Sequence, residues 1–599
     1  MINFFSKQLF LFDPLTIFFL SVIGLVSIPS AIFATGYLRG ESALKKLTVS
    51  ALFLCFVSSM CFVVTAGNLL SFLIFWELMS LTSYFLVVLD YKHEKSVRAG
   101  TIYLVMTHAG TACLMAALFI LYKYAGSFDY LAVKEAAALM PVNVRNAVFL
   151  LSFVGFATKA GVVPFHIWLP YAHPQAPSYI SSVMSGVMIK IAIYGMIRFY
   201  INLLAPAPAW WGAVILIFGI FSCLAGAIYA LMARDLKKIL AYSSVENIGI
   251  ILLGIGAAVF FSGRGMGGLA ALALCAGLYH LVNHALFKGL LFLCSGSVYR
   301  QTGGLRDMEK MGGLIRPMPV TALFFLIGAM GISALPPLNG FVSEWLTFQV
   351  FFSAFTQSGG AVKMFMVLSA SVLALTGGLA AACFVRAFGM TFLAMPRSKH
   401  AQEAKEANLS MKAGMALLAV PVILFGAGAG LIAPVMYNIS QSVLGGEKIA
   451  HTFYSVSVLP FTIMISLAAL GAVVFILMKF VIKVKRTIYN TWDCGYYALD
   501  SRTEYTPTAF AKPFRIVFGF FLLPYRKSEK IRDSFYHVSA FKYETHTTLV
   551  FKKYFYEPIV SLIYAFACKM RKLQPGSIHL YILYIFITLV CLVWFVTVF

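Results

Sequence analysis

The sequence predicts an all-α polytopic membrane protein, and three observations support this fold class. The chain of 599 residues is 61% hydrophobic and only 11% charged, far from the usual composition of soluble domains. Apolar segments of about 20 residues, long enough to cross a bilayer as helices, recur from one end of the chain to the other. The short alternating segments of a membrane β-barrel do not occur in the sequence.

We predict about fourteen transmembrane spans from these apolar segments. Met1 to Leu38 has no charged leader and no small-residue cleavage site, so we expect it to be a retained first span rather than a signal peptide. The predicted spans are 12–37, 44–66, 68–90, 97–124, 145–170, 174–203, 209–232, 238–261, 269–298, 318–352, 363–394, 411–437, 453–482 and 578–599.

The net charge of +24 might suggest nucleic-acid binding, but the distribution of charge indicates a membrane instead. Loops after odd-numbered spans are rich in Lys and Arg, whereas loops after even-numbered spans hold few. Because basic loops stay in the cytoplasm, we predict a cell inner membrane protein with its N-terminus outside. The ten cysteines are scattered without a C-x-x-C pair, so the pattern indicates no iron–sulfur, zinc or disulfide framework.

The clearest functional signal is the stretch Y-H-L-V-N-H-A-L-F-K in the middle of the apolar run 269–293. It places His280, His284 and Lys288 four residues apart, on one face of a helix. A charged lysine at mid-bilayer costs about 2.5–3.5 kcal/mol, so this helix should lie inside a bundle and have a use. We interpret that use as proton transfer. A metal site is a weak alternative, because no third ligand lies within reach.

Further ionisable side chains lie in or at the ends of the predicted spans. Lys237 and Lys238 are close enough to a span end to reach the surface, and Arg386 could have a structural role. His280 could be an ordinary core histidine, and a role for His166 and His173 stays open. The remaining candidates for proton translocation are Glu77, Lys159, Lys190, Glu246 and Glu344.

Two spans are predicted to be interrupted. Lys159 is followed by Pro164 and Pro170, and Glu344 follows the segment A-L-P-P-L-N-G, residues 334–340. Proline removes backbone hydrogen bonds, so these helices should break near mid-membrane.

The two broken spans are five spans apart, and other charged residues recur with the same spacing. Glu77 and Glu246 form one such pair, and Lys190 and Arg386 form another. Because five is odd, the second set must be inverted in the membrane. Two inverted five-helix repeats with broken helices are typical of ion-coupled transporters.

The repeats suggest a division into six segments. Residues 1–43 form an N-terminal helix, and two additional spans follow the repeats. Basic and aromatic residues alternate after Lys483; within this region, 545–572 resembles an amphipathic surface helix, and the chain then re-enters the bilayer as an anchor. The segments are 1–43, 44–208 (first repeat), 209–395 (second repeat), 396–483, 484–577 (cytoplasmic or lateral amphipathic segment) and 578–599 (anchor).

Residues 12–483 resemble the antiporter-like, proton-pumping membrane subunits of respiratory complex I, Mrp antiporters and membrane-bound NiFe hydrogenases. Four motifs carry the resemblance. They are F-W-E-L-M-S with Glu77, T-K-A-G-V-V-P-F-H-I-W-L-P with Lys159, H-L-V-N-H-A-L-F-K with His280, His284 and Lys288, and L-P-P-L-N-G-F-V-S-E-W with Glu344.

Within this family, the motif W-D-C-G-Y at Trp492–Tyr496 and the C-terminal surface helix with its anchor resemble the formate hydrogenlyase and hydrogenase 4 branch. The sequence also departs from the family. It begins where the third helix of the family usually begins. Arg386 stands where relatives tend to have lysine, and Thr111 stands where some complex I subunits have aspartate.

The resemblance implies a proton-translocating subunit of a multi-subunit oxidoreductase. In this hypothesis Glu77 pairs with Lys159, whose proton passes through His280 and His284 to Lys288 and leaves at Glu344. The chain itself should hold no redox cofactor. A NiFe centre and iron–sulfur clusters are expected in partners, namely other membrane subunits and a peripheral redox arm. A sodium/proton antiporter subunit and a structural membrane platform remain alternatives.

Overall fold

The computed structural model describes residues 10–445, 451–482, 492–496, 498–501, 503–532, 538–571 and 576–598. Parts of the predicted segments 1–43, 396–483, 484–577 and 578–599 therefore lie outside the described residues. The chain divides into two compact units, the first ending at Lys512 and the second beginning at Pro513.

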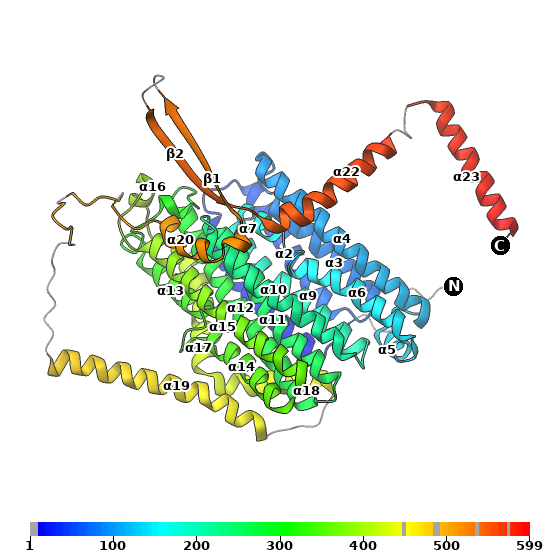
Figure 1. Ribbon diagram of the computed structural model, residues 1–599, viewed down its shortest axis with the longest axis horizontal. Helices are drawn as coiled ribbons and strands as arrows, with labels where there is room; N and C mark the ends of the chain where they lie inside the picture. The colour runs from blue at the N-terminus through cyan, green and yellow to red at the C-terminus, as the bar shows by residue number, and fades with distance from the viewer. Residues whose placement is uncertain are drawn as a thin grey trace. The chain divides into compact units, whose positions relative to one another are not determined.

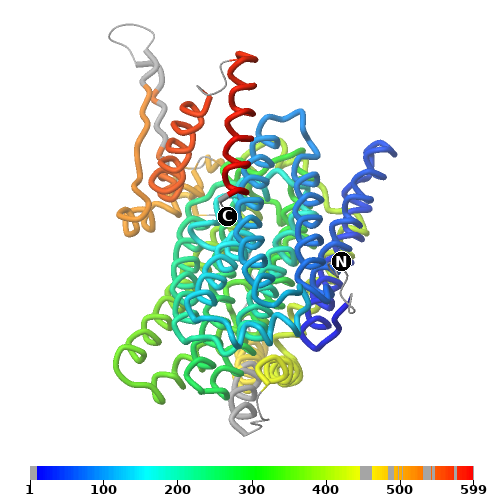
Figure 2. Tube along the Cα trace, turned by 90° about the vertical axis from the view of Figure 1, so that its right-hand side faces the viewer, coloured from blue at the N-terminus to red at the C-terminus, as the bar shows by residue number. Residues whose placement is uncertain are grey.

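The first unit is a bundle of helices, many of which run along a common direction (Figure 2). Its elements are α1 (Pro14–Tyr37), α2 (Ala43–Thr65), α3 (Leu69–Val87), α4 (Glu94–Ala125), α5 (Tyr130–Leu139), α6 (Val142–Ala160), α7 (Leu169–Gln175), α8 (Ser178–Val183), the π-helical η1 (Met184–Met188), α9 (Ile189–Ile197), the π-helical η2 (Arg198–Leu203), α10 (Ala209–Met232), α11 (Leu236–Ser262), α12 (Gly267–Gln301), the short 3₁₀ helix η3 (Met308–Lys310), α13 (Pro319–Ile332), α14 (Asn339–Gln357), α15 (Gly360–Phe392), α16 (Lys399–Gln402), α17 (Leu409–Ala427), α18 (Ala429–Leu444), α19 (His451–Ile476) and the π-helical η4 (Leu477–Val481).

Eleven helical segments among the described residues are long and apolar enough to cross a membrane, which confirms a polytopic helical membrane protein. Three predicted spans are not among the eleven. The spans 145–170 and 318–352 are each divided into two helices by a break. Within the third, 453–482, the apolar helix Ile465–Val481 is shorter than a span.

Contacts between loops confirm that the chain alternates between two sides of the bundle. On one side, the Arg300 side chain bonds the Arg39 carbonyl oxygen at 2.5 Å, and Arg306 bonds the Pro174 carbonyl oxygen at 2.6 Å. On the other side, the backbone N–H of Leu11 donates a hydrogen bond to the carbonyl oxygen of Thr65 at 2.8 Å. The loops that we predicted to share a side therefore meet one another.

Helices α11 and α12 form the centre of the bundle, where Figure 1 shows them among the other helices. Almost every residue of α11 and α12 is buried. Glycines allow α10 to approach α11 closely. A Cβ atom added to Gly226 would lie 2.4 Å from the backbone nitrogen of Glu246, so only glycine fits there. Charged residues of these helices are thereby shielded from lipid.

Both predicted helix breaks are present. Helix α6 ends one residue after Lys159, and α7 begins only at Leu169. Gly161 closes α6 in a left-handed conformation, with φ of +78°, which is typical of a glycine helix cap. In the second break, α13 ends at Ile332 and α14 begins at Asn339. Each break therefore places a helix end close to an ionisable side chain, Lys159 in the first break and Glu344 in the second.

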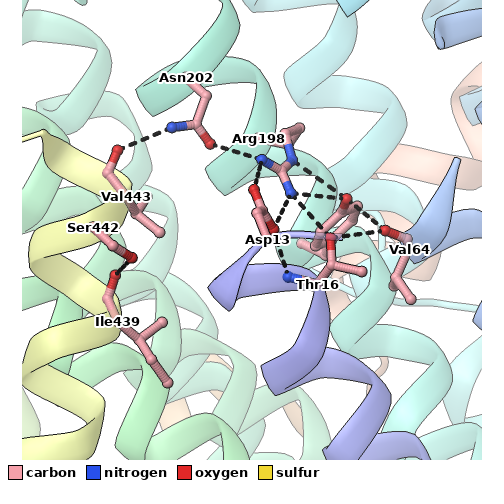
Figure 3. A network of polar contacts seen from close by, with 9 residues as sticks. Asp13, Thr16, Val64, Arg198, Asn202, Ile439, Ser442 and Val443 are labelled. Carbon is pink, nitrogen blue, oxygen red and sulfur yellow. Dashed lines mark hydrogen bonds and ion pairs between the residues drawn. The ribbon is translucent and has the colours of Figure 1, made fainter. Parts of the chain in front are cut away.

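An ion pair joins Asp13, the N-cap of α1, to Arg198, the first residue of η2, on the side of the chain start (Figure 3). Arg198 bonds both carboxylate oxygens of Asp13, at 2.6 and 3.0 Å, and also contacts Thr16 and Tyr194. Asn202, one turn later, bonds the carbonyl oxygen of Val443 at 2.9 Å. This network ties three parts of the chain that are far apart in sequence.

The second unit corrects two predictions. It contains a β-hairpin of β1 (Pro524–Arg532) and β2 (Val538–Thr547), paired antiparallel, so the chain is not entirely helical. The predicted amphipathic helix 545–572 begins later than expected, because its first residues belong to β2 and the T-H-T-T run favours a strand. The helices here are α20 (Pro507–Val517), which crosses the unit boundary, α21 (Gly519–Leu522), the π-helical η5 (Lys552–Tyr556), α22 (Glu557–Arg571) and α23 (Ile578–Val598).

Candidate functional site

Most of the candidate residues lie inside the helical bundle. Nine of the eleven are buried, and their side chains come from α6, α9, α11, α12, α14 and α15. The buried candidates are Lys159, Lys190, Lys237, Glu246, His280, His284, Lys288, Glu344 and Arg386. The other two are Glu77, which is partly exposed, and Lys238, which is exposed.

Lys159 lies in the last turn of α6, directly before the helix break. Its amino group donates hydrogen bonds to the hydroxyl of Ser80 at 2.9 Å and to that of Tyr103 at 2.8 Å. Tyr103 also shares a 2.6 Å hydrogen bond with Ser83. Helices α3 and α4 therefore surround this buried amine with hydroxyl groups.

The direct contacts of Glu77 are not with Lys159. The side chain of Glu77 is 28% exposed, and its carboxylate Oε2 lies 3.5 Å from Nε2 of His108 on α4. Lys159 donates to Ser80, one helical turn after Glu77. The pairing of Glu77 with Lys159 therefore stays a prediction, with Ser80 and His108 as the groups that the two side chains contact.

Lys190 and Lys288 are joined by a short chain of polar groups. Lys190 donates to the Ser185 carbonyl oxygen at 2.5 Å, and the Ser185 hydroxyl bonds that of Ser244 at 2.7 Å. The Ser244 hydroxyl and the Lys288 amino group both bond the Leu240 carbonyl oxygen. Ser185 lies in the π-helical turn η1, and such turns often occur at functional sites.

A second chain continues from Lys288 toward Glu344. The amino group of Lys288 bonds the hydroxyl of Ser243. The amide of Asn247 bonds the Ser243 carbonyl at 2.8 Å and His280 Nε2 at 3.1 Å. The Nδ1 atom of His280 lies 3.0 Å from the Ser343 hydroxyl, one residue before Glu344.

These contacts bear on the order that the sequence suggested. We expected His280 and His284 to precede Lys288 on the path from Lys159. The hydrogen bonds of His280 are with Ser343 and Asn247, on the side of Glu344, and the order of transfer stays a prediction. Both ring nitrogens of His284 are buried, with no hydrogen-bond partner among residues 10–445. The spacing of four residues placed the three groups on one face but could not order them.

Two other candidates are buried without strong partners. The Oε2 atom of Glu246 has no hydrogen-bond partner in the described part of the bundle, and neither ring nitrogen of His173 has one. His166 lies beside the break after α6, with its ring 6.5 Å from that of Tyr242. The sequence alone placed these residues in spans but gave no contacts for them.

Lys237 lies at the edge of the bundle beside a cavity. Its amino group donates to the carbonyl oxygen of Ala176 at 2.8 Å, and it lies 5.4 Å from the centre of the Tyr299 ring. Tyr299 also lines a cavity of about 430 Å³ with Asp90 and His93. Lys237 is therefore close to a polar opening on the side of the basic loops.

Lys238 and Arg386 differ from the other candidates. Lys238 is exposed and turned away from the bundle. Arg386 donates hydrogen bonds to the carbonyl oxygens of Leu231 and Ala233 at the end of α10. A cation at a helix C-terminus interacts favourably with the helix dipole, so Arg386 has a structural contact and a fixed charge.

Several polar contacts of these lysines and histidines come from residues that the sequence did not single out. Ser80, Tyr103, Ser243, Asn247 and Ser343 all contact a candidate residue directly. Ser80 follows Glu77 by one helical turn, and Ser343 precedes Glu344. A search for hydroxyl or amide groups within one turn of each ionisable residue could have found several of them.

This arrangement suits proton transfer more than binding of a large ligand. Hydroxyl groups can both donate and accept hydrogen bonds, and a neutral histidine has one donor and one acceptor nitrogen. Joined lysines, serines and histidines can therefore pass protons over short distances. Between Tyr103 and Lys190 the link is weak, because the contact of the Tyr103 hydroxyl on the Lys190 side is with the sulfur of Met188, at 3.6 Å.

Comparisons with known proteins give a consistent result. Residues 66–374 match the family described as NADH:quinone oxidoreductase/Mrp antiporter, TM. The chain is 36% identical to hydrogenase-4 component B of Escherichia coli over 97% of this chain and 88% of the relative. It is 34% identical to formate hydrogenlyase subunit 3 of Escherichia coli over 76% and 72% of the two chains.

A solved structure shares the fold. A chain of the membrane-bound sulfane sulfur reductase, an archaeal respiratory membrane complex, matches with a TM-score of 0.77 and 22% identity, over 97% of this chain and 88% of that chain. The likeness extends over nearly the whole helical bundle.

Proposed function

Because the chain belongs to the NADH:quinone oxidoreductase/Mrp antiporter family of membrane subunits, we propose that it moves protons through its buried polar chain. The driving reaction is redox chemistry in partner subunits of a hydrogenase-like or complex I-like oxidoreductase. The similarity to hydrogenase-4 component B and formate hydrogenlyase subunit 3 supports this branch.

The observation that carries the proposal is the set of neighbouring polar contacts from Lys190 through Lys288 to His280. Serine hydroxyls, the Asn247 amide and backbone carbonyls hold the ionisable side chains close together. Isolated buried lysines are costly in a bilayer. Here two lysines and a histidine share one line of serine, asparagine and backbone groups, which places the ionisable side chains within short transfer steps. Ser343 extends the line to the neighbour of Glu344.

We assign the first half of the path to Glu77, Lys159 and Lys190 and the second half to Lys288 and Glu344. The two halves correspond to the proposed inverted five-helix repeats, within a chain of about fourteen spans. The two helix breaks support this assignment, because each lies in the fourth span of its set. Water reaches mid-membrane through the breaks from opposite sides.

The side with the basic loops is the cytoplasm in this proposal, so the N-terminus lies outside in a cell inner membrane. Protons are taken up at the cavity lined by Asp90 and His93, beside Lys237. On the opposite side, a cavity of about 530 Å³ is lined by Asp13, Asp129 and Arg198. It supplies a water-accessible opening for release.

The partners in this proposal are other membrane subunits and a peripheral redox arm. The names of the relatives, a hydrogenase component and a formate hydrogenlyase subunit, support such an assembly. The NiFe centre and iron–sulfur clusters are assigned to the partners. This chain contributes the positions that hold and move protons.

The test is proton translocation by the intact complex in inverted membrane vesicles, measured with and without sodium. We expect acidification of the vesicle interior driven by the redox reaction and independent of sodium. Lys159→Met and Lys288→Ala should each abolish coupled proton movement, whereas Lys123→Met, at the exposed end of α4, should not. Unchanged proton-to-electron ratios in both interior variants would instead support a structural platform.

A sodium/proton antiporter subunit is the second candidate, because the family also includes Mrp antiporters. This reading requires that sodium gradients alone drive proton movement in the vesicles. Redox-driven acidification in sodium-free buffer would exclude it.

A further inference from the structure

A histidine that belongs to none of the four sequence motifs contacts Glu77, the carboxylate of the F-W-E-L-M-S motif. His108 lies near the middle of α4 and Glu77 near the middle of α3. His108 Nε2 is 3.5 Å from Glu77 Oε2. If the distance between these two atoms shortens by about half an ångström, they form a hydrogen bond of normal length.

The orientation of the imidazole ring determines where its protons lie. The Nδ1 atom of His108 is 3.1 Å from the carbonyl oxygen of Leu104, one turn earlier in α4. A carbonyl oxygen only accepts hydrogen bonds, so Nδ1 carries a hydrogen. Nε2 then faces the carboxylate of Glu77. Two lone pairs would repel each other there, so the contact is stable when one proton lies between the nitrogen and the oxygen.

The position of the pair in the bundle adds a second constraint. The side chain of His108 is 47% exposed and that of Glu77 is 28% exposed. They lie on helix faces that also carry exposed apolar residues such as Ile74 and Val105. A net charge on such an apolar face is unfavourable in free energy. With one shared proton the pair is neutral overall, whereas without it the pair carries one negative charge. The second carboxylate oxygen of Glu77, Oε1, is buried and has no hydrogen-bond partner in the described bundle.

The buried cation on this side of the bundle is Lys159. It reaches this region from α6 by bonding Ser80, one turn after Glu77, and Tyr103, which lies on α4. The helices packed against α3 and α4 are α2, α5, α6 and α7, and their other titratable or charged side chains include Lys45, Lys46, Cys61, Lys134, Glu135, Arg145 and His173. Lys159 is therefore the cation whose charge the pair can balance.

We propose that His108 and Glu77 form a proton-sharing pair that holds one proton opposite Lys159. When Lys159 carries its proton, the pair releases its own and becomes negative. When Lys159 is neutral, the pair takes the proton back, as imidazolium with carboxylate or as imidazole with carboxylic acid. One proton moves in each direction and no bond other than N–H or O–H changes. This inference rests on the proposed function and names His108 as a further proton-holding residue.

The first measurement concerns the pair itself and does not depend on pumping. In the intact complex with ¹⁵N-labelled histidine, the His108 signal and the Glu77 carboxyl infrared band should change together in one pH step. Glu77→Gln should change the His108 signal and its pH dependence, because the carboxylate that shares the proton is then absent. An unchanged His108 titration in Glu77→Gln would overturn the proposal.

The second measurement concerns coupling. His108→Gln, which keeps a polar side chain but cannot hold the proton, should lower the number of protons moved per electron pair. The matched control is His400→Gln, because His400 is an exposed histidine in the short helix α16 and belongs to no part of the proposed path. Equal proton yields in His108→Gln and wild type would also overturn the proposal. If the titrations are coupled but Lys159→Met pumps normally, the pair stands and the proposed function fails.

Discussion

At the scale of single residues, the three interior lysines share one kind of environment. Lys159 bonds two hydroxyl groups, Lys190 bonds a backbone carbonyl, and Lys288 bonds one of each. None of these contacts is with a carboxylate group. A hydroxyl can accept from an ammonium group and donate to a neutral amine. Neutral partners of this kind accommodate a lysine in both protonation states, which an ion pair does not.

The link between Lys288 and His280 gives the first prediction. Asn247→Leu removes the amide that bonds both Ser243 and His280. Loss of a buried hydrogen bond costs about 1–2 kcal/mol. If this cost is added to the activation free energy, the transfer step becomes roughly 5- to 30-fold slower. We expect slower coupled proton movement in vesicles with unchanged assembly of the complex. Asn143→Leu, at an exposed position in the first turn of α6, is the control and should pump normally.

The ion pair of Asp13 and Arg198 gives a prediction about pH. Although partial burial alone raises the pKa of Asp13, its hydrogen bonds and the charge of Arg198 outweigh that effect and lower it. A lowered carboxyl pKa contributes stability above the unfolded-state value, about 3.9, and that stability is lost as pH falls through the folded-state value.

We therefore expect Asp13→Asn to lower the stability of the bundle near pH 7 by about 1–3 kcal/mol, less than for a fully buried pair because Asp13 is partly exposed. Thermal unfolding in detergent at several pH values measures this. The difference from wild type should shrink below about pH 4. A stability difference between Asp13→Asn and wild type that stays constant over the whole pH range would contradict this prediction.

At the scale of helices, the breaks bring backbone ends to the ionisable groups. Gly161 has a left-handed φ, and a Cβ there would lie 1.8 Å from Leu169. Gly161→Val should therefore destabilise the bundle by roughly 2–3 kcal/mol and disturb Lys159, two residues away. Thermal unfolding and proton translocation check both effects. Gly378→Ala, where nothing lies within 4 Å, should be neutral or slightly stabilising.

The end of α10 gives a prediction for Arg386. Arg386→Met leaves the carbonyls of Leu231 and Ala233 without their cation and should cost about 2–4 kcal/mol of stability. Arg386→Lys should cost less. Because arginine does not deprotonate in proteins, the number of protons moved per electron pair should stay the same in Arg386→Lys. A large drop in that number would show that Arg386 takes part in transfer.

At the scale of the whole molecule, the arrangement of loops predicts accessibility from two sides. In a background with the exposed cysteines replaced, Lys238→Cys should react with a membrane-impermeant thiol reagent only from the cytoplasmic side. Leu139→Cys, at an 89% exposed position in α5, should react only from the outside. Labelling of both from the same side would reject the proposed orientation.

Much of the site could be predicted from the sequence, but not its connections. Apolar segment length, loop charge and the prolines near Lys159 and Glu344 gave the spans, the alternation of sides and the two breaks. The contacts of Glu77, His280 and Arg386 depend on groups from distant helices. The β-hairpin was missed because charged and aromatic residues alternate there with no long apolar run.

The sequence by itself determined that this is a polytopic membrane protein with costly ionisable residues at mid-span, because transfer into a bilayer depends on composition over about 20 residues. Only the tertiary structure decided which of those residues meet. The reason is geometric: a helix fixes the face on which a side chain lies, whereas a hydrogen bond requires two helices to place their groups within about 3 Å of each other.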